Sequence, residues 1–372
     1  MKTLRLAVLP GDGIGIEVTE TTLPVFEKLG VPVDVQFGDI GWEFWKKEGN
    51  PVPERTWELI ESSDATMIAA ITSKPHAQAM AELSQELRET GVSYLSPVIQ
   101  LRQRLGLFAN VRPVFSIPGN PRQIADNMNF TVIRENTEGL YAGFDFSPIP
   151  DELFEFIQRK KGARSSWQME SPMDGAVALR LMTRDGVKRL LHFAFQCARD
   201  QGYPRVTWVD KPNVMRESGQ FCLDILEEVA AEYPGIPWEV QNVDATAMWM
   251  VRDPGHFGVI VSENQFGDIL SDLGAGLMGG LGLAPSANLG AEKAYFEPVH
   301  GSAPKHAGKG IVNPSAMFLT TSLTLKHHGY TDQADAIQRA VASVIEEGKV
   351  LTYDLGGNAT TREMADAILA RL

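Results

Sequence analysis

Short apolar runs alternate with segments of helical periodicity along most of this 372-residue chain, and this alternation restricts the possible folds more than any other feature. Leu4–Leu9 is apolar apart from Arg5, and the glycines that follow turn the chain into a helix expected from about Glu17 to Leu29. Further strands are expected at Val33–Phe37, Ala65–Ile71, Phe108–Val114, Val206–Asp210 and Gly258–Ser262. Further helices are expected at Val52–Ser62, Pro97–Leu105, Arg184–Gln201, Ser218–Glu232, Ser315–His328 and Asp332–Glu347. The pattern predicts an α/β fold in which helices cover both faces of a sheet.

Two stretches interrupt the alternation. Ser147–Met173 carries several prolines and a basic run over residues 159–164, and we expect an irregular arm that contacts another subunit. Glycine recurs between Gly274 and Gly290, and we expect a loop-rich passage there and onward to Pro314. A chain of this length favours two packed units, and because neither a repeat nor a low-complexity linker separates them, we expect the units to interleave.

The charge balance narrows the choice of partners. The chain has 34 Lys and Arg against 47 Asp and Glu, a net charge of −13, which repels phosphate backbones and anionic membrane surfaces. We therefore expect neither nucleic acid nor a membrane as a partner, and no apolar window reaches the length of a signal-peptide core or a spanning helix. The two cysteines, Cys197 and Cys222, lack a metal-binding spacing and fit a reducing, cytoplasmic setting.

Three aspartates are candidate metal ligands. Asp268 and Asp272 stand four residues apart, so on a helix they would share one face. Like charges at this spacing destabilise a bare helix by roughly 0.2–0.5 kcal/mol, which favours a bound cation, and Asp244 offers a third carboxylate. Hard oxygen ligands without Cys or His in either motif favour Mg²⁺ or Mn²⁺. The alternative is that these are helix-capping or solvated acids.

Three arginines and one lysine are candidates for substrate chemistry. Arg102, Arg112 and Arg134 offer planar guanidinium groups that would suit a substrate with several carboxylates, and the alternative is surface ion pairs. Lys211 directly follows a predicted strand, where desolvation or a nearby metal ion would make it a base. The alternative for Lys211 is a solvated side chain.

Two glycine-containing loops are candidates for nucleotide binding. The first, Gly11–Gly15, has the spacing GxGxG and lacks the third glycine that a Rossmann fingerprint requires. The second, His300–Gly308, is the better candidate, because its small residues let the backbone approach a phosphate and Lys305 supplies charge. The alternative is a plain surface turn.

Together these segments resemble the metal-dependent β-decarboxylating dehydrogenases, the family of isocitrate, homoisocitrate, 3-isopropylmalate and tartrate dehydrogenases. The resemblance runs from Leu9–Gly15 to Asp354–Gly357, which is nearly the whole chain. It implies an isopropylmalate dehydrogenase-like two-domain fold that is not Rossmann. Residues 1–104 and 280–372 would form a discontinuous nucleotide-binding domain, and residues 105–279 a domain for substrate, metal and dimerisation. It also implies a homodimer or higher homo-oligomer with shared active sites.

The resemblance also assigns roles to single residues. It implies that Lys211 takes the hydroxyl proton of the substrate and that Tyr141 returns a proton after decarboxylation. It implies that Asp268 and Asp272 hold Mg²⁺ or Mn²⁺ together with Asp244 of the neighbouring subunit, which also supplies Lys211. The residues that it assigns to a hydroxy-polycarboxylate substrate are Ser96, Arg102, Arg112, Arg134 and Asn213. Those that it assigns to the cofactor are Thr72, His300, Gly301, Ser302, Ala303, Pro304, Lys305, His306, Asn313 and Tyr353.

The residues at a few positions narrow the choice of substrate and the choice of cofactor. Isocitrate-type members present a serine where Ser96 stands, and a hydrogen-bonding site discriminates against an apolar third arm, so we expect isocitrate or homoisocitrate. A 3-isopropylmalate or tartrate type is the alternative. Val98 matches neither pattern and Thr72–Ser93 is unusual for the family, so a malate derivative outside these types is also an alternative. A non-catalytic regulatory subunit is a second alternative, against which stands the presence of every catalytic group. Lys305, with its neighbours, resembles the NADP-specific pattern, so NADP is expected before NAD.

Overall fold

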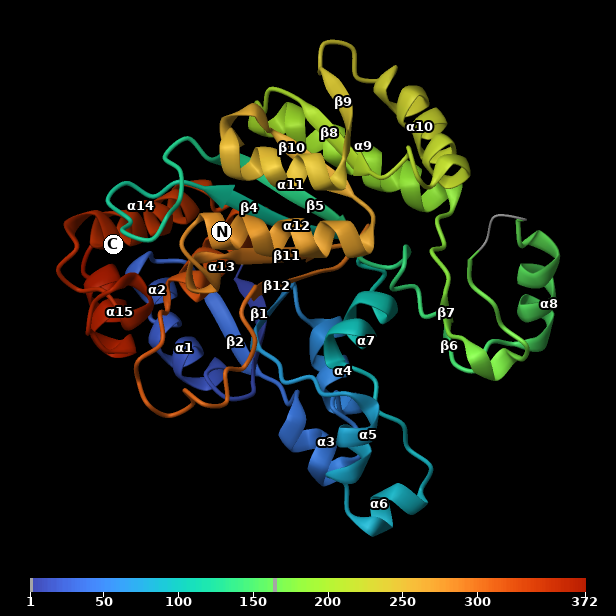
Figure 1. Cartoon of the computed structure of the whole chain (residues 1–372). Coiled ribbons are helices and arrows are strands. Elements are labelled where there is room, and N and C mark those ends of the chain that lie inside the picture. The colour runs from blue at the N-terminus through green and yellow to red at the C-terminus, as the bar shows by residue number, and fades with distance from the viewer. Residues whose placement is uncertain (1–2, 163–165) are drawn as a thin grey trace.

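A ten-stranded sheet forms the centre of the protein, which we describe from a computed structural model over residues 3–162 and 166–372 (Figure 1). Its strand order is β2-β1-β3-β12-β11-β4-β5-β10-β8-β9. These strands are β1 (Leu4–Gly11), β2 (Val33–Phe37), β3 (Ala65–Ala70), β4 (Ala109–Phe115), β5 (Asn129–Glu135), β8 (Val206–Asp210), β9 (Trp238–Asn242), β10 (Val259–Ser262), β11 (Pro285–Leu289) and β12 (Ala294–Pro298). All the predicted strands are present, and the α/β class is confirmed.

The sheet is parallel on both sides and antiparallel in its centre. Parallel pairs join β2, β1, β3 and β12 on one side and β5, β10, β8 and β9 on the other. In between, β12, β11, β4 and β5 pair antiparallel. The passage that we expected to be loop-rich therefore contains a hairpin, β11 and β12, at the middle of the sheet. The sheet is continuous between β11 and β4, so the division into two domains stays a prediction.

Helices cover both faces of this sheet. They are α1 (Gly15–Thr22), α2 (Val25–Lys28), α3 (Trp42–Glu48), α4 (Glu54–Ser62), α5 (His76–Ala81), α6 (Gln85–Glu89), α7 (Pro97–Arg104), α9 (Arg184–Gln201), α10 (Arg216–Ala230), α11 (Val243–Arg252), α12 (Asn264–Leu277), α13 (Ser315–His327), α14 (Thr331–Glu347) and α15 (Thr361–Leu369). The helix expected from Glu17 to Leu29 is divided into α1 and α2 at Pro24, which lacks a backbone donor. No helix in residues 3–162 and 166–372 is both long and apolar enough to cross a membrane.

A projecting segment between β5 and α9 is the predicted arm. It contains a two-stranded sheet of β6 (Asp145–Phe146) and β7 (Val177–Ala178), and it stands away from the main body in Figure 1. The expectation of an irregular arm was wrong in one respect, because α8 (Asp151–Lys160) forms a helix that buries none of its residues. Residues 163–165, at the end of the predicted basic run, lie outside the described residues.

Candidate active site

Two of the arginines lie side by side on the central strands and face α12. Arg112 on β4 donates from Nη1 to Asp272 Oδ1 at 2.7 Å and to Ser271 Oγ at 2.8 Å. Arg134 on neighbouring β5 forms an ion pair with Asp268. Asp268 and Asp272 therefore share one face of a helix, as their spacing predicts, and that face is turned toward the arginines.

Gly267 allows this close approach of helix and sheet. A Cβ atom on Gly267 would lie 2.7 Å from the Cβ of Arg134, which real side chains essentially never allow. The glycine next to Asp268 thus sets the distance at which the carboxylate meets the guanidinium group. Any larger residue at position 267 would push α12 away from β5.

The three arginines form a buried cluster of positive charge. Burial lowers the pKa of Arg112, and burial together with the charge of Arg102 lowers the pKa of Arg134 to about 10. Burial also disfavours the charged form of Arg102. The neighbouring Tyr295 and Glu297 outweigh this effect and raise the pKa of Arg102. Like charges held together out of water are costly unless anions join them, so the cluster is suited to a ligand with several carboxylates.

A buried amide network behind the arginines holds them in place. Asn288 Oδ1 accepts from Arg102 Nε at 3.2 Å and from the side-chain amides of Asn110 and Asn136, each at 2.8 Å. Its own Nδ2 donates to Glu297 Oε1 at 2.9 Å. Sequence reasoning missed this network. Asn110 could have been found, since it lies two residues before Arg112 on one strand and so on the same face, but Asn288 lies in the hairpin that we read as loop.

We expect Asn288→Ala to lower the free energy of unfolding by about 2–4 kcal/mol, because three buried donors and Glu297 lose a partner in a water-poor network. Urea denaturation measures the effect. The matched control is Asn127→Ala, whose side chain is exposed and should cost within about 0.5 kcal/mol. Equal stability of the two variants would mean that the network does not support the arginines.

Lys211 and Asp244 form a separate pair. Lys211 directly follows β8, where the carboxylate of buried Asp210 accepts its backbone N–H at 2.8 Å and pairs with Arg180 at 2.9 Å. Asp244, in the first turn of α11, forms an ion pair with the Lys211 ammonium, which lowers the pKa of Asp244. Within the described residues no three His, Cys, Asp or Glu side chains gather into a metal-binding group. One chain alone therefore does not bring Asp244 to the other two aspartates.

The remaining substrate candidates lie at the edge of the arginine cluster. The guanidinium carbon of Arg134 lies 5.8 Å from the centre of the Tyr141 ring, which is half exposed. Ser96 directly precedes α7, the helix that carries Arg102, without a capping hydrogen bond from its side chain, and its Oγ lies 2.9 Å from Ser73 Oγ. Asn213 is exposed just beyond Lys211, and the structure shows no contact between it and the arginines over residues 3–162 and 166–372.

The two predicted loops pack against each other. Ile14 N donates to Ser302 O at 2.9 Å, and a Cβ on Gly13, which has φ +56°, would collide with that same oxygen. Thr72 Oγ1 lies 2.6 Å from Ser302 Oγ. The N-terminal glycines thus support the His300–Gly308 loop instead of forming a phosphate cradle of their own, which explains why a Rossmann spacing is absent.

The rest of the predicted cofactor residues gather beyond this loop. His306 stacks on Tyr353 with ring centres 5.7 Å apart, and Asn313 Nδ2 donates to Asp354 at 3.0 Å. Ala303 has a φ of +37°, an unusual backbone conformation, while Pro304 and Lys305 are exposed. In the described residues His300 Nε2 and His306 Nδ1 are buried without a hydrogen-bond partner. Such orphaned ring nitrogens fit a site completed by a bound polar group.

One cavity connects the arginines to this loop. It has a volume of about 180 Å³, and its lining includes Val98, Arg102, Arg112, Glu297, His300 and Gly301. A small acid bound to the arginines would therefore lie next to a cofactor held by the loop. This juxtaposition is what hydride transfer requires, because both reactants must be in contact.

Comparisons with known proteins agree with this geometry. The profile of the family described as isocitrate/isopropylmalate dehydrogenase matches residues 5–368. Protein DlpA of Legionella pneumophila is 56% identical over 366 residues, which cover 98% of this chain but only 58% of DlpA. The 3-isopropylmalate dehydrogenase of Methanothermobacter thermautotrophicus is 41% identical over 372 residues, covering 100% of this chain and 99% of that protein.

A solved structure is also similar. The isocitrate dehydrogenase from Methylococcus capsulatus superposes with a TM-score of 0.84 at 37% identity, covering 99% of both chains. The family uses a divalent metal and NAD(P), and the hard oxygen ligands of α12 and the orphaned histidines are suited to both. This chain belongs to the isocitrate/isopropylmalate dehydrogenase family.

Proposed function

We propose that this protein catalyses the NAD(P)-dependent oxidative decarboxylation of a 2-hydroxy acid that carries a carboxylate on C3, of the isocitrate or homoisocitrate type. The observation that carries the proposal is the buried arginine cluster, which shares a cavity with the predicted cofactor loop. A substrate with two or three carboxylates would match the charge of this cluster, and its C2 hydrogen would face the loop.

The residues present fit a divalent metal. Asp268 and Asp272 are partly exposed even though each contacts an arginine, so each keeps an oxygen for a further ligand. We propose that they hold Mg²⁺ or Mn²⁺ together with Asp244 from a second subunit. Bound there, the metal would polarise the hydroxyl of the substrate and, after oxidation, its keto oxygen.

The residues of the chain itself would move the protons. To act as a base, Lys211 would have to be in its neutral form. Lys211 would then take the proton of the C2 hydroxyl, and a nicotinamide cofactor held by the His300–Gly308 loop would accept the C2 hydride. The C3 carboxylate leaves as CO₂, its bonding electrons remain on the substrate as an enolate, and Tyr141 protonates C3. The arginines hold the carboxylates through these steps.

We propose a homodimer with shared sites. Helix α11, which carries Asp244 in its first turn, exposes Met248, Trp249 and Val251, and Ile269 is 57% exposed beside Asp268 on α12. Large exposed apolar side chains on adjacent helices are typical of an interface between identical subunits. Packing α11 of one subunit near α12 of the other would bring Asp244 and Lys211 to the partner's metal site. The free thiols of Cys197 and Cys222 fit a cytoplasmic enzyme.

The type of substrate is proposed from the surroundings of Ser96. The segment 72–93, unusual for the family, places Ser73 next to Ser96, so two hydroxyl groups lie at the N-terminus of α7. Such a site favours a polar third arm over an isopropyl group, because its two hydroxyl groups can hydrogen-bond a polar arm but not an apolar one. Val98, which matches neither the isocitrate nor the 3-isopropylmalate pattern, lines the cavity, and the 3-isopropylmalate type remains the second candidate.

A panel of assays tests the function. Isocitrate, homoisocitrate, 3-isopropylmalate, tartrate and malate are each assayed with NADP or NAD and with Mg²⁺ or Mn²⁺, following reduced cofactor at 340 nm and release of CO₂. We expect turnover that EDTA abolishes and added metal restores, highest with isocitrate or homoisocitrate. Turnover with 3-isopropylmalate alone would favour the second candidate, and inactivity with all five acids would favour a regulatory subunit.

We propose that NADP is preferred, since Lys305 is exposed beside the stacked His306 and Tyr353, where it could contact a 2′-phosphate. Lys305→Asp should lower the ratio of kcat/KM for NADP over NAD at least about 10-fold, because a carboxylate repels the phosphate and accepts from a ribose hydroxyl. The control is Lys309→Asp, an equal charge change on the same loop. Equal ratios in the two variants would remove Lys305 from the cofactor site.

A further inference from the structure

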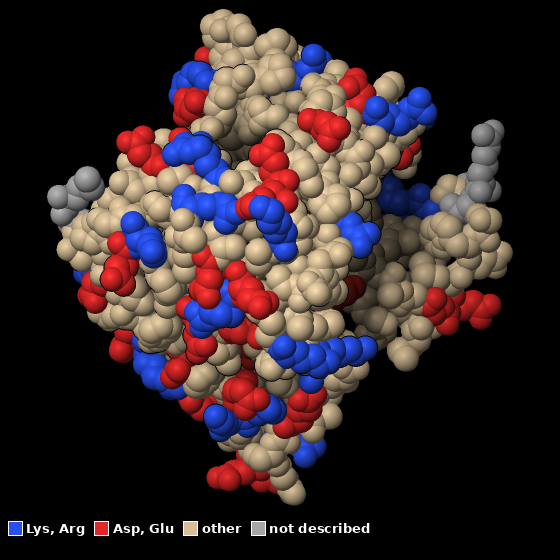
Figure 2. All heavy atoms as spheres, turned by 90° about the vertical axis from the view of Figure 1, so that its left-hand side faces the viewer, with Lys and Arg blue, Asp and Glu red and all other residues tan. Residues whose placement is uncertain are grey.

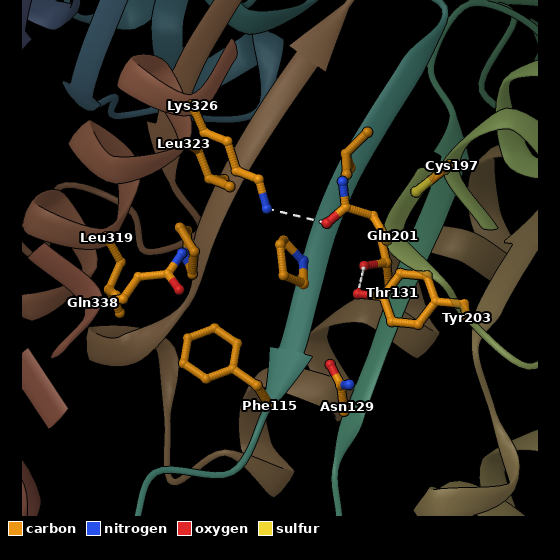
Figure 3. Close-up of a pocket in the computed structure, with 13 residues that line it drawn as sticks. Phe115, Asn129, Thr131, Cys197, Gln201, Tyr203, Leu319, Leu323, Lys326 and Gln338 are labelled. Atoms are coloured by element: carbon orange, nitrogen blue, oxygen red, sulfur yellow. Dashed lines mark hydrogen bonds between the residues drawn. The ribbon is translucent and has the colours of Figure 1, made fainter. Parts of the chain in front are cut away.

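A second, larger cavity lies on the face of the sheet opposite the arginines (Figure 3). It has a volume of about 350 Å³ and lies between α9 and α13, over strands β4 and β5. Val111, Pro113 and Phe115 form its floor, and Leu319 and Leu323 of α13 form one wall. A smaller lobe of about 220 Å³ shares Phe115, Leu319 and Gln338 with it, so the apolar space continues toward α14.

Alternation along β4 separates this cavity from the active site. Arg112 points to α12, while Val111 and Pro113 on either side of it line the cavity behind the sheet. The two cavities therefore share a strand but no lining residue. A ligand in the rear cavity would contact neither the arginines nor the cofactor loop.

A single cation lies at the mouth of the rear cavity. Lys326 Nζ donates to Gln201 Oε1 at 3.0 Å, and Figure 3 shows this bond reaching from α13 across the opening to the end of α9. Over residues 3–162 and 166–372 no carboxylate lies within 4.0 Å of the Lys326 ammonium. Burial raises the pKa of Cys197 to about 11, so the thiol in the wall is uncharged.

We propose that this cavity binds a small amphipathic monocarboxylate, with its carboxylate on Lys326 and Gln201 and its apolar body against Phe115, Leu319 and Leu323. One cation at the mouth of the cavity, without an acidic partner among the described residues, matches one negative charge. The apolar floor matches an alkyl or aryl body, and the volume lies in the range of sites for small metabolites. The proposal does not depend on the catalytic function.

Calorimetric titration of the full chain with 4-methylpentanoate tests the proposal, with 4-methylpentanamide as the uncharged probe of the same shape. We expect saturable binding of one carboxylate per chain and at least about 10-fold weaker binding of the amide. Lys326→Met should weaken binding of the carboxylate at least about 10-fold, while Lys349→Met, at an exposed lysine that does not line the cavity, should leave it unchanged. Equal binding by the Lys326 and Lys349 variants would overturn the proposal.

Two further measurements locate the probe and remain informative if Lys326→Met does not fold. Alkylation of Cys197 by N-ethylmaleimide at pH 9, followed by mass spectrometry, should slow several-fold in the presence of the carboxylate, because the thiol lines the cavity. Leu323→Trp, which fills the cavity, should abolish the binding. Binding without protection of Cys197, or unaltered binding by Leu323→Trp, would place the probe elsewhere and reject the site. Neither readout involves turnover, so failure here is separate from failure of the proposed function.

Discussion

We expect Lys211→Met to lower kcat by about 10²–10⁴-fold and to leave the KM of the hydroxy acid within a few-fold, because methionine keeps the apolar stem but could not accept the hydroxyl proton as the proposed base does. Lys211 reaches its position through Asp210, which binds the lysine's backbone N–H and is itself held by Arg180. That support involves the main chain and survives the substitution. Steady-state kinetics across pH 6–9 measure the loss.

The control for this prediction is Lys188→Met. It removes a lysine of similar partial exposure whose partner, Glu228, lies on α10 at the surface, and kcat should stay within about two-fold. Binding of Mn²⁺ to the Lys211 variant, followed by electron paramagnetic resonance, should be retained. If kcat falls only because Mn²⁺ no longer binds, Lys211 supports the metal site and another group is the base.

Mixing two inactive variants should restore activity. Asp244→Asn and Asp268→Asn each remove a carboxylate from the proposed metal site, so each homodimer should lose at least about 10³-fold in turnover. A hybrid dimer places both substitutions at one site and leaves the other intact. Random reassortment makes half of the dimers hybrid, so co-refolding the two variants should recover about a quarter of wild-type activity.

The matched control combines Asp268→Asn with Asp272→Asn. Both residues lie on α12 of the same subunit, so every hybrid site lacks one of them and no activity should return. Recovery in this control, or no recovery in the first mixture, would show that Asp244 does not act across the subunit boundary.

Where a pattern was strong and local, the sequence predicted the fold to the residue. The strand Val33–Phe37, the helix Arg184–Gln201 and the strand Val206–Asp210 begin and end as expected. The hairpin of β11 and β12 was missed because the surrounding glycines suggest loops and because Asn288 and Glu297 interrupt its apolar pattern. Those strands are held by partners far away in sequence, β3 and β4, which no local window contains.

The arm shows a different limit of prediction from sequence. Helix α8 directly follows Pro150 and runs into the basic run over residues 159–164, and the prolines and this run suggested irregular structure. Its apolar residues, such as the half-exposed Phe156, are not covered within one chain, so burial gives no signal for them.

The sequence predicted some parts of the candidate site and missed others, for similar reasons. Asp268 and Asp272 share one face of α12 as their spacing predicts, but their contacts with Arg112 and Arg134 were not predicted, and the roles of all four residues stay predictions. The amides that hold the arginines carry no such signal, because any asparagine can be a surface residue until the fold buries it.

The unbroken sheet has a mechanical consequence. Because β12, β11, β4 and β5 are hydrogen-bonded edge to edge, the two sides of the molecule cannot slide past each other at an interface; they can only bend about the strands that join them. Any opening or closing around a substrate then bends the sheet itself. The side chains packed on both faces of β4 set how stiff the sheet is against this bending. Residues that touch no reactant, such as Phe115, would thereby help to set how fast the enzyme admits and releases its ligands.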